Sequence, residues 1–315
     1  MARAPVLAVD VGGTKLAAAL VRGAEVLDQE LVATPAKEGP EAVLAELRTA
    51  VEALVGRAPE TPVALGVACA GLVRAGKVRA VSRDLLPGWD DFPLVERLES
   101  AFGLPVAALN DAQAAAYGEA LHGAGRERGS SFFVTVSTGV GGGFVIGDRL
   151  WQGATGLAGH LGHVGGGVLE RVASGPALAR RAAEFGHATT ARELVAAAEE
   201  LQPWASGLVA DAAAALATAL VDIKYLLDPE VVVLGGGVGL NPVFRRALEK
   251  ALQGLGEDER VLVLAAELGA AAGLVGAAAW AVEGVQDRVR LALPEGSHHP
   301  PDALQVKQLM PDEPP

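Results

Sequence analysis

Short apolar runs alternate along the chain with stretches in which apolar residues recur every three or four positions. The short runs predict β-strands at residues 6–11, 15–22, 25–34, 63–67, 106–109, 131–136, 144–147, 231–234 and 261–265. The longer stretches predict helices at residues 40–56, 111–122, 176–185, 190–201, 208–227 and 269–283, and a further helix that begins at Asn241-Pro242. Strands that alternate with helices in this way are typical of an α/β protein.

The local pattern of the first hairpin recurs in the second half of the chain. Residues 9–14 and 136–141 each contain the end of a strand, a polar residue, a glycine turn and the start of another strand. This repetition predicts two halves with a common plan, each opening with a glycine-tipped β-turn. The alternative is that two unrelated hairpins both carry glycine, as many tight turns do.

The composition narrows the class of protein further. The chain has 315 residues, which suggests about two domains of roughly 150 residues each. Half of the residues are hydrophobic and 20% are charged, so disorder over most of the length is excluded. The single cysteine, Cys69, excludes an internal disulfide and a zinc site built from several thiolates.

Charge and hydropathy also predict the surroundings of the protein. The 26 basic and 38 acidic side chains give a net charge of −12, so we expect neither nucleic acid nor an anionic membrane as a partner. No signal peptide opens the sequence, and the longest uncharged apolar stretch, residues 268–282, is shorter than the ~20 residues that span a bilayer. We therefore expect a cytoplasmic protein, with a loosely ordered tail over residues 285–315.

The glycine turns are candidate phosphate sites, because main-chain N–H groups approach a phosphate closely only where no Cβ intervenes. They are Gly12-Gly13 and residues 139–143, with Thr14 and Thr138 as hydroxyl donors. The alternative interpretation is two structural hairpins. Neither turn has the P-loop spacing or the Gly-x-Gly-x-x-Gly spacing, so both of those nucleotide-binding classes are excluded.

Two aspartates lie where predicted strands end. Asp10 precedes the first turn and could hold Mg²⁺ beside phosphates, or it could close the hairpin as an Asx turn. Asp111, after Asn110, could cap the following helix. It could also be a general base at the carboxyl end of a strand, where α/β sheets bind their ligands. One residue could do both, with its side chain facing a cleft while its backbone starts the helix.

A histidine pair and a lone glutamate complete the set of candidates. His160 and His163 are three residues apart, which suits a metal site on a helix, yet only Glu170 lies near enough to be a further ligand. The alternatives are a hydrogen-bonded or solvated histidine pair and a surface glutamate. Ser174-Gly175-Pro176 predicts the start of a helix.

Seven segments follow one another in a specific order over residues 6–284. They are Asp10-Val11-Gly12-Gly13-Thr14-Lys15, Leu86-Pro87-Gly88-Trp89, Asn110-Asp111-Ala112-Gln113-Ala114-Ala115, Ser137-Thr138-Gly139-Val140-Gly141-Gly142-Gly143, residues 153–163, Leu169-Glu170 with Ser174-Gly175, and Gly235-Gly236-Gly237. In this order they resemble the ROK family of sugar kinases and repressors. The resemblance implies the actin-like ATPase (ribonuclease H-like) fold, with two domains and an interdomain cleft. The implied domains are residues 1–115 joined by a closing helix at about 269–284, and residues 116–268.

The resemblance also implies a role for each matching residue. Asp111 would be the base that takes the proton from a sugar hydroxyl, the one on carbon 6. The sugar ligands would be Gly71, Asn110, Asp111, His160, His163 and Glu170. The contacts to ATP phosphates or to Mg²⁺, the latter held by Asp10, would come from Asp10, Gly12, Gly13, Thr14, Lys15, Thr138 and Gly139, and Gly235 and Gly236 would flank the adenosine.

The sequence departs from the family pattern in two places. Most relatives carry a zinc loop with three cysteines after the second histidine, but here only residues 164–169 separate His163 from Glu170. We therefore expect no structural zinc, and another group must orient His163. His160 replaces the glutamate of glucose-type members, and the form Gly-His-x-Gly-His resembles bacterial N-acetylmannosamine kinases. This favours N-acetylmannosamine as the substrate, with glucose as the alternative.

Other functions within the resemblance lead to different expectations. Repressors of the family carry a helix-turn-helix domain before the kinase-like part, whereas five residues precede the first predicted strand here. A catalytically silent sugar-binding protein is a further alternative, although both aspartates and both glycine turns are intact. The family also suggests a homodimer.

Overall fold

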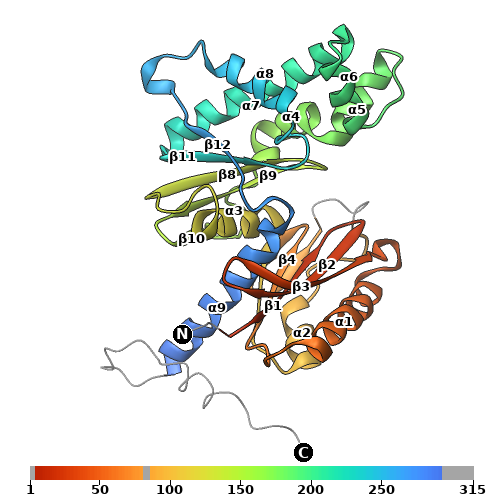
Figure 1. The fold of residues 1–315 in the computed structure, drawn as a ribbon, viewed down its shortest axis with the longest axis vertical. Coiled ribbons are helices and arrows are strands. Elements are labelled where there is room, and N and C mark those ends of the chain that lie inside the picture. The colour runs from red at the N-terminus through yellow and green to blue at the C-terminus, as the bar shows by residue number, and fades with distance from the viewer. Residues whose placement is uncertain (1–3, 81–85, 293–315) are drawn as a thin grey trace, which may run out of the picture. The chain divides into compact units, whose positions relative to one another are not determined.

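The computed structural model describes residues 4–80 and 86–292, with side chains to residue 286, and they form two compact units (Figure 1). Unit 1 consists of residues 1–114 together with the chain from residue 274 onward. Unit 2 consists of residues 115–273. Each unit is built around its own five-stranded sheet and its own hydrophobic core.

The sheet of unit 1 has the order β3-β2-β1-β4-β7. Its strands are β1 (Val6–Val11), β2 (Lys15–Arg22), β3 (Glu25–Ala33), β4 (Leu65–Cys69) and β7 (Val106–Asn110). The first three strands form an antiparallel meander, and β4 and β7 run parallel to β1. The parallel strands are apolar almost throughout, as expected for strands that are covered on both faces.

Helices cover both faces of this sheet. Large residues such as Leu7 and Val9 of β1 share one core with α1 (Pro40–Arg57) and α2 (Leu94–Phe102). In β4 the residues of the other parity, Gly66 and Ala68, are small, and α9 (Ala272–Ala292) lies directly on Gly66. A Cβ atom on Gly66 of β4 would be 1.9 Å from the carbonyl oxygen of Ala277. A separate hairpin is formed by β5 (Leu72–Arg74) and β6 (Lys77–Arg79).

The sheet of unit 2 repeats the plan of the first. Its order is β10-β9-β8-β11-β12, and its strands are β8 (Ser130–Val136), β9 (Val140–Ile146), β10 (Arg149–Trp151), β11 (Val231–Gly235) and β12 (Val263–Ala265). Again three antiparallel strands precede two parallel ones. The prediction of two halves with a common plan is therefore confirmed.

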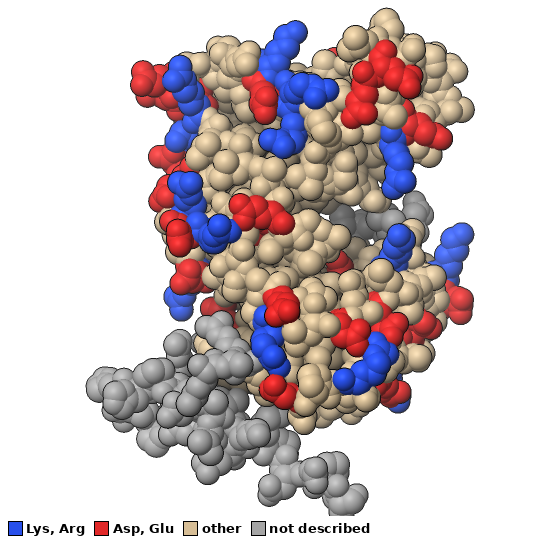
Figure 2. All heavy atoms as spheres, in the orientation of Figure 1, with Lys and Arg blue, Asp and Glu red and all other residues tan. Residues whose placement is uncertain are grey.

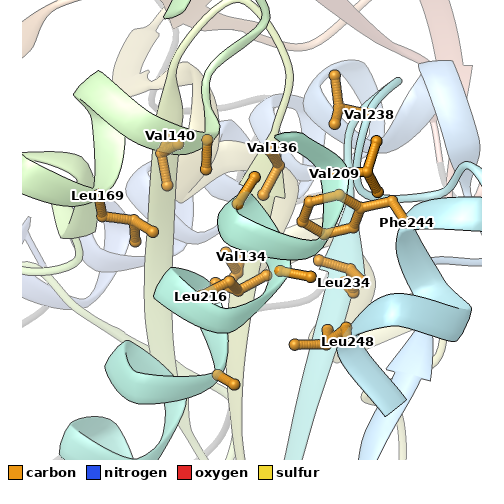
Figure 3. Close-up of a cluster of buried hydrophobic side chains, with 14 of the residues drawn as sticks. Val134, Val136, Val140, Leu169, Val209, Leu216, Leu234, Val238, Phe244 and Leu248 are labelled. Carbon is orange, nitrogen blue, oxygen red and sulfur yellow. The ribbon is translucent and has the colours of Figure 1, made fainter. Parts of the chain in front are cut away.

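The core of unit 2 lies between its sheet and a layer of helices (Figure 3). In this view Val209 and Leu216 of α7 and Phe244 of α8 project toward Val134 of β8 and Leu234 of β11. The helices of this layer are α4 (Val164–Ala173), α5 (Gly175–Glu184), α6 (Ala191–Glu199), α7 (Pro203–Leu227) and α8 (Pro242–Leu252). By length and composition α7 could cross a membrane, but its apolar residues are used in this core.

A buried carboxylate forms hydrogen bonds that join the two ends of unit 2. Glu119 lies on α3 (Asp111–His122), along which the chain enters the unit. Its Oε2 accepts hydrogen bonds from the amides of Ala124 at 2.9 Å and Glu267 at 3.1 Å, and its Oε1 accepts one from Leu268 at 2.8 Å. The segment that precedes α9 is therefore fastened to the helix that opens the unit.

The structure corrects several predicted boundaries. The strand expected at residues 144–147 begins at Val140, so the second glycine turn consists of residues 137–139 rather than 139–143. Gly142 is paired with Val134 of β8, and this strand requires glycine there because a Cβ would lie 2.5 Å from the carbonyl oxygen of Phe133. The closing helix continues to Ala292, into the expected tail of residues 285–315; residues 293–315 lie outside the described part. Helices α2 and α4 and the β5–β6 hairpin were not predicted.

Figure 2 shows how charge is distributed over one face. On that face, basic side chains are interspersed with acidic ones and do not form one continuous basic surface. Among the described residues, Arg97 is paired with Glu41 at 2.6 and 2.7 Å, and Arg181 is paired with Asp211 at 2.6 Å. This face lacks the basic stripe that typifies a nucleic-acid interface.

Candidate functional site

Neighbouring parallel strands bring the predicted residues of unit 1 to one edge of its sheet. Asp10 lies next to the end of β1, and Cys69 at the end of β4 is paired with Asn110 at the end of β7. Gly71 follows β4, and Asp111 follows β7. In open α/β sheets this edge is where ligands bind. Residues from three distant parts of the sequence thus form one local site.

Asn110 caps helix α3. Its Oδ1 accepts hydrogen bonds from the backbone amides of Ala112 at 3.0 Å and Gln113 at 3.2 Å. These amides lie in the first turn, where the helix itself supplies no acceptor. The Asp111 carboxylate accepts a hydrogen bond from the adjacent amide of Ala112 at 2.8 Å, whereas the amide of Gln113 is bound by Asn110. The interpretation of Asp111 as the helix cap is therefore wrong, and its side chain is available for another role.

The side-chain carboxamide of Asn110 makes all of its hydrogen bonds within the protein. Its Nδ2 donates to the carbonyl oxygen of Gly71 at 3.0 Å and to Oδ1 of Asp111 at 2.9 Å. With two acceptances at Oδ1, all four hydrogen bonds of a carboxamide are made. Gly71 is buried with a φ of +130°, and a Cβ there would lie 2.7 Å from the carbonyl oxygen of Arg79. In this structure both residues serve the local architecture.

Two carboxylates share the edge of this sheet. Burial, reinforced by the negative charge of Asp111, raises the pKa of Asp10 from 3.8 to about 7. Solvent reaches Asp111, yet the surrounding protein removes enough water to raise its pKa, and hydrogen bonds from Ala112 and Asn110 partly oppose this effect. Burial likewise raises the pKa of the Cys69 thiol. A carboxylate with a raised pKa is a better proton acceptor, and two that share an edge attract a cation.

The first glycine turn joins β1 to β2. The amide of Gly12 donates to the carbonyl oxygen of Lys15 at 3.1 Å, and a Cβ on Gly12 would lie 3.0 Å from that oxygen. Thr14 and Lys15 are exposed, and Gly13 is partly exposed. No hydrogen bond between described residues reaches the Asp10 carboxylate, so the Asx-turn alternative is wrong. The backbone closes the hairpin and leaves Asp10 for a ligand.

The second glycine turn joins β8 to β9. The amide of Ser137 donates to the carbonyl oxygen of Gly139 at 2.9 Å, and Thr138 at the tip is exposed. Gly139 does not have a left-handed φ, and a Cβ there would lie 3.5 Å from the Glu170 carboxylate, an ordinary contact. Neither the backbone nor packing requires glycine at this position. The close approach of a ligand is a reason that remains.

At the end of β11 the fold requires glycine at two of three consecutive positions, 235 and 236, but not at 237. A Cβ on Gly235 would lie 2.6 Å from the ring of Phe133, and one on Gly236, with a φ of +85°, would lie 2.4 Å from the carbonyl oxygen of Val136. Gly237 is exposed and a Cβ there would meet nothing within 4 Å. Gly237 was not among the predicted nucleotide contacts, and its signal was only its place in the run.

The two histidines lie together but not on a helix. His160 precedes a short 3₁₀ turn, and His163 ends it. Their rings are stacked, with centroids 6.3 Å apart. Nδ1 of His160 is 3.2 Å from the carbonyl oxygen of Leu157, so that nitrogen carries the proton and Nε2 is an acceptor. Burial and the neighbouring His163 lower the pKa of His160, so it is neutral at pH 7.

An unusual turn follows the histidines, at the place where the family pattern has a zinc loop that this sequence lacks. Gly165, Gly166 and Gly167 all have left-handed conformations, with φ values of 61°, 72° and 82°. The guanidinium of Arg171 donates to the carbonyl oxygen of Gly166. Glu170 lies in the helical part of α4, and its Oε2 accepts from the amide of Val140 at 3.0 Å. Among the described residues there is no cluster of three or more metal-ligating side chains.

The predicted site residues thus form one group in each unit. The group of unit 1 contains Asp10, Gly12, Gly13, Thr14, Lys15, Gly71, Asn110 and Asp111. The group of unit 2 contains Thr138, Gly139, His160, His163, Glu170, Gly235 and Gly236. The first offers carboxylates and a glycine turn, and the second offers a glycine turn, imidazoles and a carboxylate.

The chain is similar to a family of known proteins. The pattern of the ROK family matches residues 6–283. The bifunctional enzyme NanE/NanK of Brucella melitensis biotype 1 is 41% identical over 280 residues, which are 87% of this chain and 53% of that protein, so the chain spans about half of its length. The N-acetylmannosamine kinase of Salmonella typhi is 38% identical over 285 residues, 86% of this chain and 96% of that enzyme. A ROK family glucokinase from Streptomyces griseus, solved with glucose and AMPPNP, has a TM-score of 0.76 and 32% identity, covering 89% of this chain and 99% of that one.

Proposed function

This chain belongs to the ROK family, as its motifs predicted, and we propose that it is an ATP-dependent sugar kinase that phosphorylates the 6-hydroxyl of an N-acylhexosamine. The observation that carries the proposal is the edge of the unit 1 sheet. There Asp111 is held by Asn110, has a raised pKa and is free of the capping role. The kinase relatives at 38–41% identity support the activity.

Asp111 is the proposed catalytic base. Its carboxylate takes the proton from the 6-hydroxyl of the sugar, the hydroxyl oxygen bonds to the γ-phosphorus of ATP, and the bond to the β,γ-bridging oxygen breaks to release ADP. The raised pKa brings the proton affinity of Asp111 closer to neutral pH, where a general base is most effective. A positioned base contributes roughly 10²–10⁴ to the rate.

The nucleotide contacts are assigned to the two glycine turns. Gly13, Thr14 and Lys15, and Thr138 with Gly139, present amides and exposed hydroxyls to the phosphates. Gly12, whose own amide closes the hairpin, leaves the turn free of a side chain where the phosphate approaches, and Gly235 and Gly236 flank the adenosine. The absence of a structural need for glycine at Gly139 supports this role. Asp10, whose carboxylate has no partner among the described residues, would hold Mg²⁺. When bound, that ion neutralises charge on the phosphates.

The sugar contacts proposed for unit 2 are His160, His163 and Glu170. Because His160 is neutral and Nε2 is its acceptor, it differs from a glutamate in both charge and hydrogen bonding. This supports N-acetylmannosamine ahead of glucose, as does the kinase of Salmonella typhi. Glucose is the alternative supported by the Streptomyces griseus glucokinase.

We also propose that no structural zinc orients His163. The segment after it contains the left-handed glycine turn and the Arg171 contact to Gly166. Elemental analysis of the dialysed protein tests this directly. One zinc per chain would contradict it.

The activity is tested with ATP, Mg²⁺ and matched concentrations of N-acetylmannosamine and glucose, by coupled ADP release and by phosphorus NMR of the product. We expect a sugar 6-phosphate, with greater kcat/KM for N-acetylmannosamine. Asp111→Asn, which keeps the shape but not the base, should keep sugar binding within a small factor and lose nearly all turnover. Near-normal turnover in that variant would exclude the assigned base, and faster glucose turnover would reverse the substrate order.

A further inference from the structure

Glu170 contacts the second glycine turn and the histidine segment at once. Its Oε2 accepts the amide of Val140 at 3.0 Å. A Cβ on Gly162 would lie 2.5 Å from the same oxygen, and one on Gly139 would lie 3.5 Å from it. The carboxylate therefore lies between the turn at Gly139 and the segment that ends in His163.

The helix that carries Glu170 is anchored beside this turn. Leu169 and Val140 belong to the same buried cluster, and Figure 3 shows both side chains at that end of it. Further along, the amide of Gly175 donates to the carbonyl oxygen of Ser137 at 2.7 Å, and a Cβ on Gly175 would lie 3.1 Å from that oxygen. The turn is thus held on one side by backbone contact and on the other by Glu170.

We propose that Glu170 is a positioning residue for the nucleotide turn as well as a sugar ligand, an inference that rests on the proposed function. Its two oxygens have different roles. Oε2 holds the amide of Val140, the residue that follows Gly139. Oε1 accepts no hydrogen bond from a described residue and is open to a sugar hydroxyl. One carboxylate then contacts the sugar and supports the turn that binds phosphate.

Support of the turn and charge repulsion predict opposite effects when the Glu170 side chain is removed and nucleotide binding is measured without sugar. By charge alone, removing a carboxylate near a phosphate site strengthens nucleotide binding, because a repulsion is lost. If the carboxylate supports the turn, removing it frees the amide of Val140 and loosens Gly139, and nucleotide binding weakens. The sign of the change therefore separates support from repulsion.

The experiment measures the Kd of Mg²⁺–AMPPNP by calorimetry in the absence of sugar, for the full chain and three variants. Glu170→Ala removes both oxygens. Glu170→Asp keeps the charge but is one methylene too short to hold Val140. Glu170→Gln keeps an acceptor for Val140 and removes the charge. We expect about three- to tenfold weaker binding for the Ala and Asp variants and a Kd within about twofold for the Gln variant.

A matched control separates the nucleotide effect from sugar binding. His163→Ala should raise the KM for sugar and leave the sugar-free Kd of AMPPNP unchanged, because no hydrogen bond between described residues joins His163 to the turn, whereas Glu170 binds the amide of Val140. If Glu170→Ala does not fold, as judged by circular dichroism, the Asp and Gln pair carries the comparison. Unchanged or tighter nucleotide binding in Glu170→Asp would exclude the positioning role. A wild-type chain that binds no nucleotide would instead overturn the proposed function.

Discussion

The side-chain amide of Asn110 donates a 2.9 Å hydrogen bond to Oδ1 of Asp111 while its own Oδ1 caps helix α3. One side chain thereby joins the helix start, the Gly71 carbonyl and the proposed catalytic base. This arrangement gives Asn110 a positioning role that the sequence resemblance, which implies a sugar ligand, does not include.

Asn110→Ala should lower kcat by about tenfold or more and reduce stability by about 1 kcal/mol, because the base loses a donor and the helix loses its cap. The measurements are steady-state kinetics and urea unfolding. Thr190→Ala is the matched control, since Thr190 caps α6 through the amide of Glu193 at 3.3 Å. It should cost similar stability and leave kcat unchanged. A variant at Asn110 that alters only the KM for sugar would instead identify a sugar ligand.

Asp10→Asn should change how the stability of the ligand-free protein depends on pH. Between 3.8 and about 7 the folded wild type keeps a proton on Asp10 that the unfolded chain has released. The contribution of Asp10 to the free energy of unfolding is therefore fully present below pH 3.8. It is lost as the pH rises to about 7, by at most about 1.4 kcal/mol per pH unit. Relative to wild type, the neutral variant should gain stability between pH 5 and pH 8 in urea unfolding. Parallel stability curves for the two proteins would show that Asp10 ionises at its ordinary pKa.

Gly139→Ala should leave the fold intact, because a methyl group fits there. It should weaken the binding of AMPPNP by about tenfold, because the methyl group would block the approach of a phosphate to the amide. Gly236→Ala should instead destabilise the protein by more than about 1 kcal/mol, since its φ is +85° and its Cβ would lie 2.4 Å from the carbonyl oxygen of Val136. Thermal unfolding and calorimetry give both quantities. Full nucleotide affinity in Gly139→Ala would remove this turn from the proposed site.

Gly66→Ala should destabilise unit 1 by about 2 kcal/mol or more, because its Cβ would lie 1.9 Å from the carbonyl oxygen of Ala277 and α9 would have to shift. The matched control is Gly56→Ala near the end of α1, where nothing lies within 4 Å of the added Cβ. That change should stabilise by about 0.5–1 kcal/mol through helix propensity. Equal stabilities of the two variants would contradict the packing of α9 on β4.

Much of the fold was predictable because its signals are local. The apolar run of β1 and the helical spacing of α1 predicted these elements within one residue, and Asn241-Pro242 predicted the start of α8. The repeated turn predicted the common plan of the two units. The signals failed where packing decides. Gly141, Gly142 and Gly143 were expected in a turn, but they lie in β9 and pair with β8. The glycine at 142 is required because other backbone approaches the strand closely there, which the sequence does not reveal.

The candidate residues were named from their motifs, but their partners were not. Sequence alone left Asp111 as either a cap or a base, and the structure assigned the cap to Asn110. It left Asp10 as either an Asx turn or a metal ligand, and the structure closed the hairpin through Gly12. Each outcome depends on which donor reaches which acceptor, and adjacent residues in a motif do not encode that geometry.

The sequence by itself determined the α/β class, the family and the identities of the chemical groups, because apolar periodicity, turn residues and ordered motifs act over a few positions. Only the tertiary structure decided which polar atoms are already paired. Asn110 finds the Gly71 carbonyl 39 residues away, and Glu170 finds the Val140 amide 30 residues away. Buried polar groups must be paired, and their partners come from strands and helices that fold together only in three dimensions.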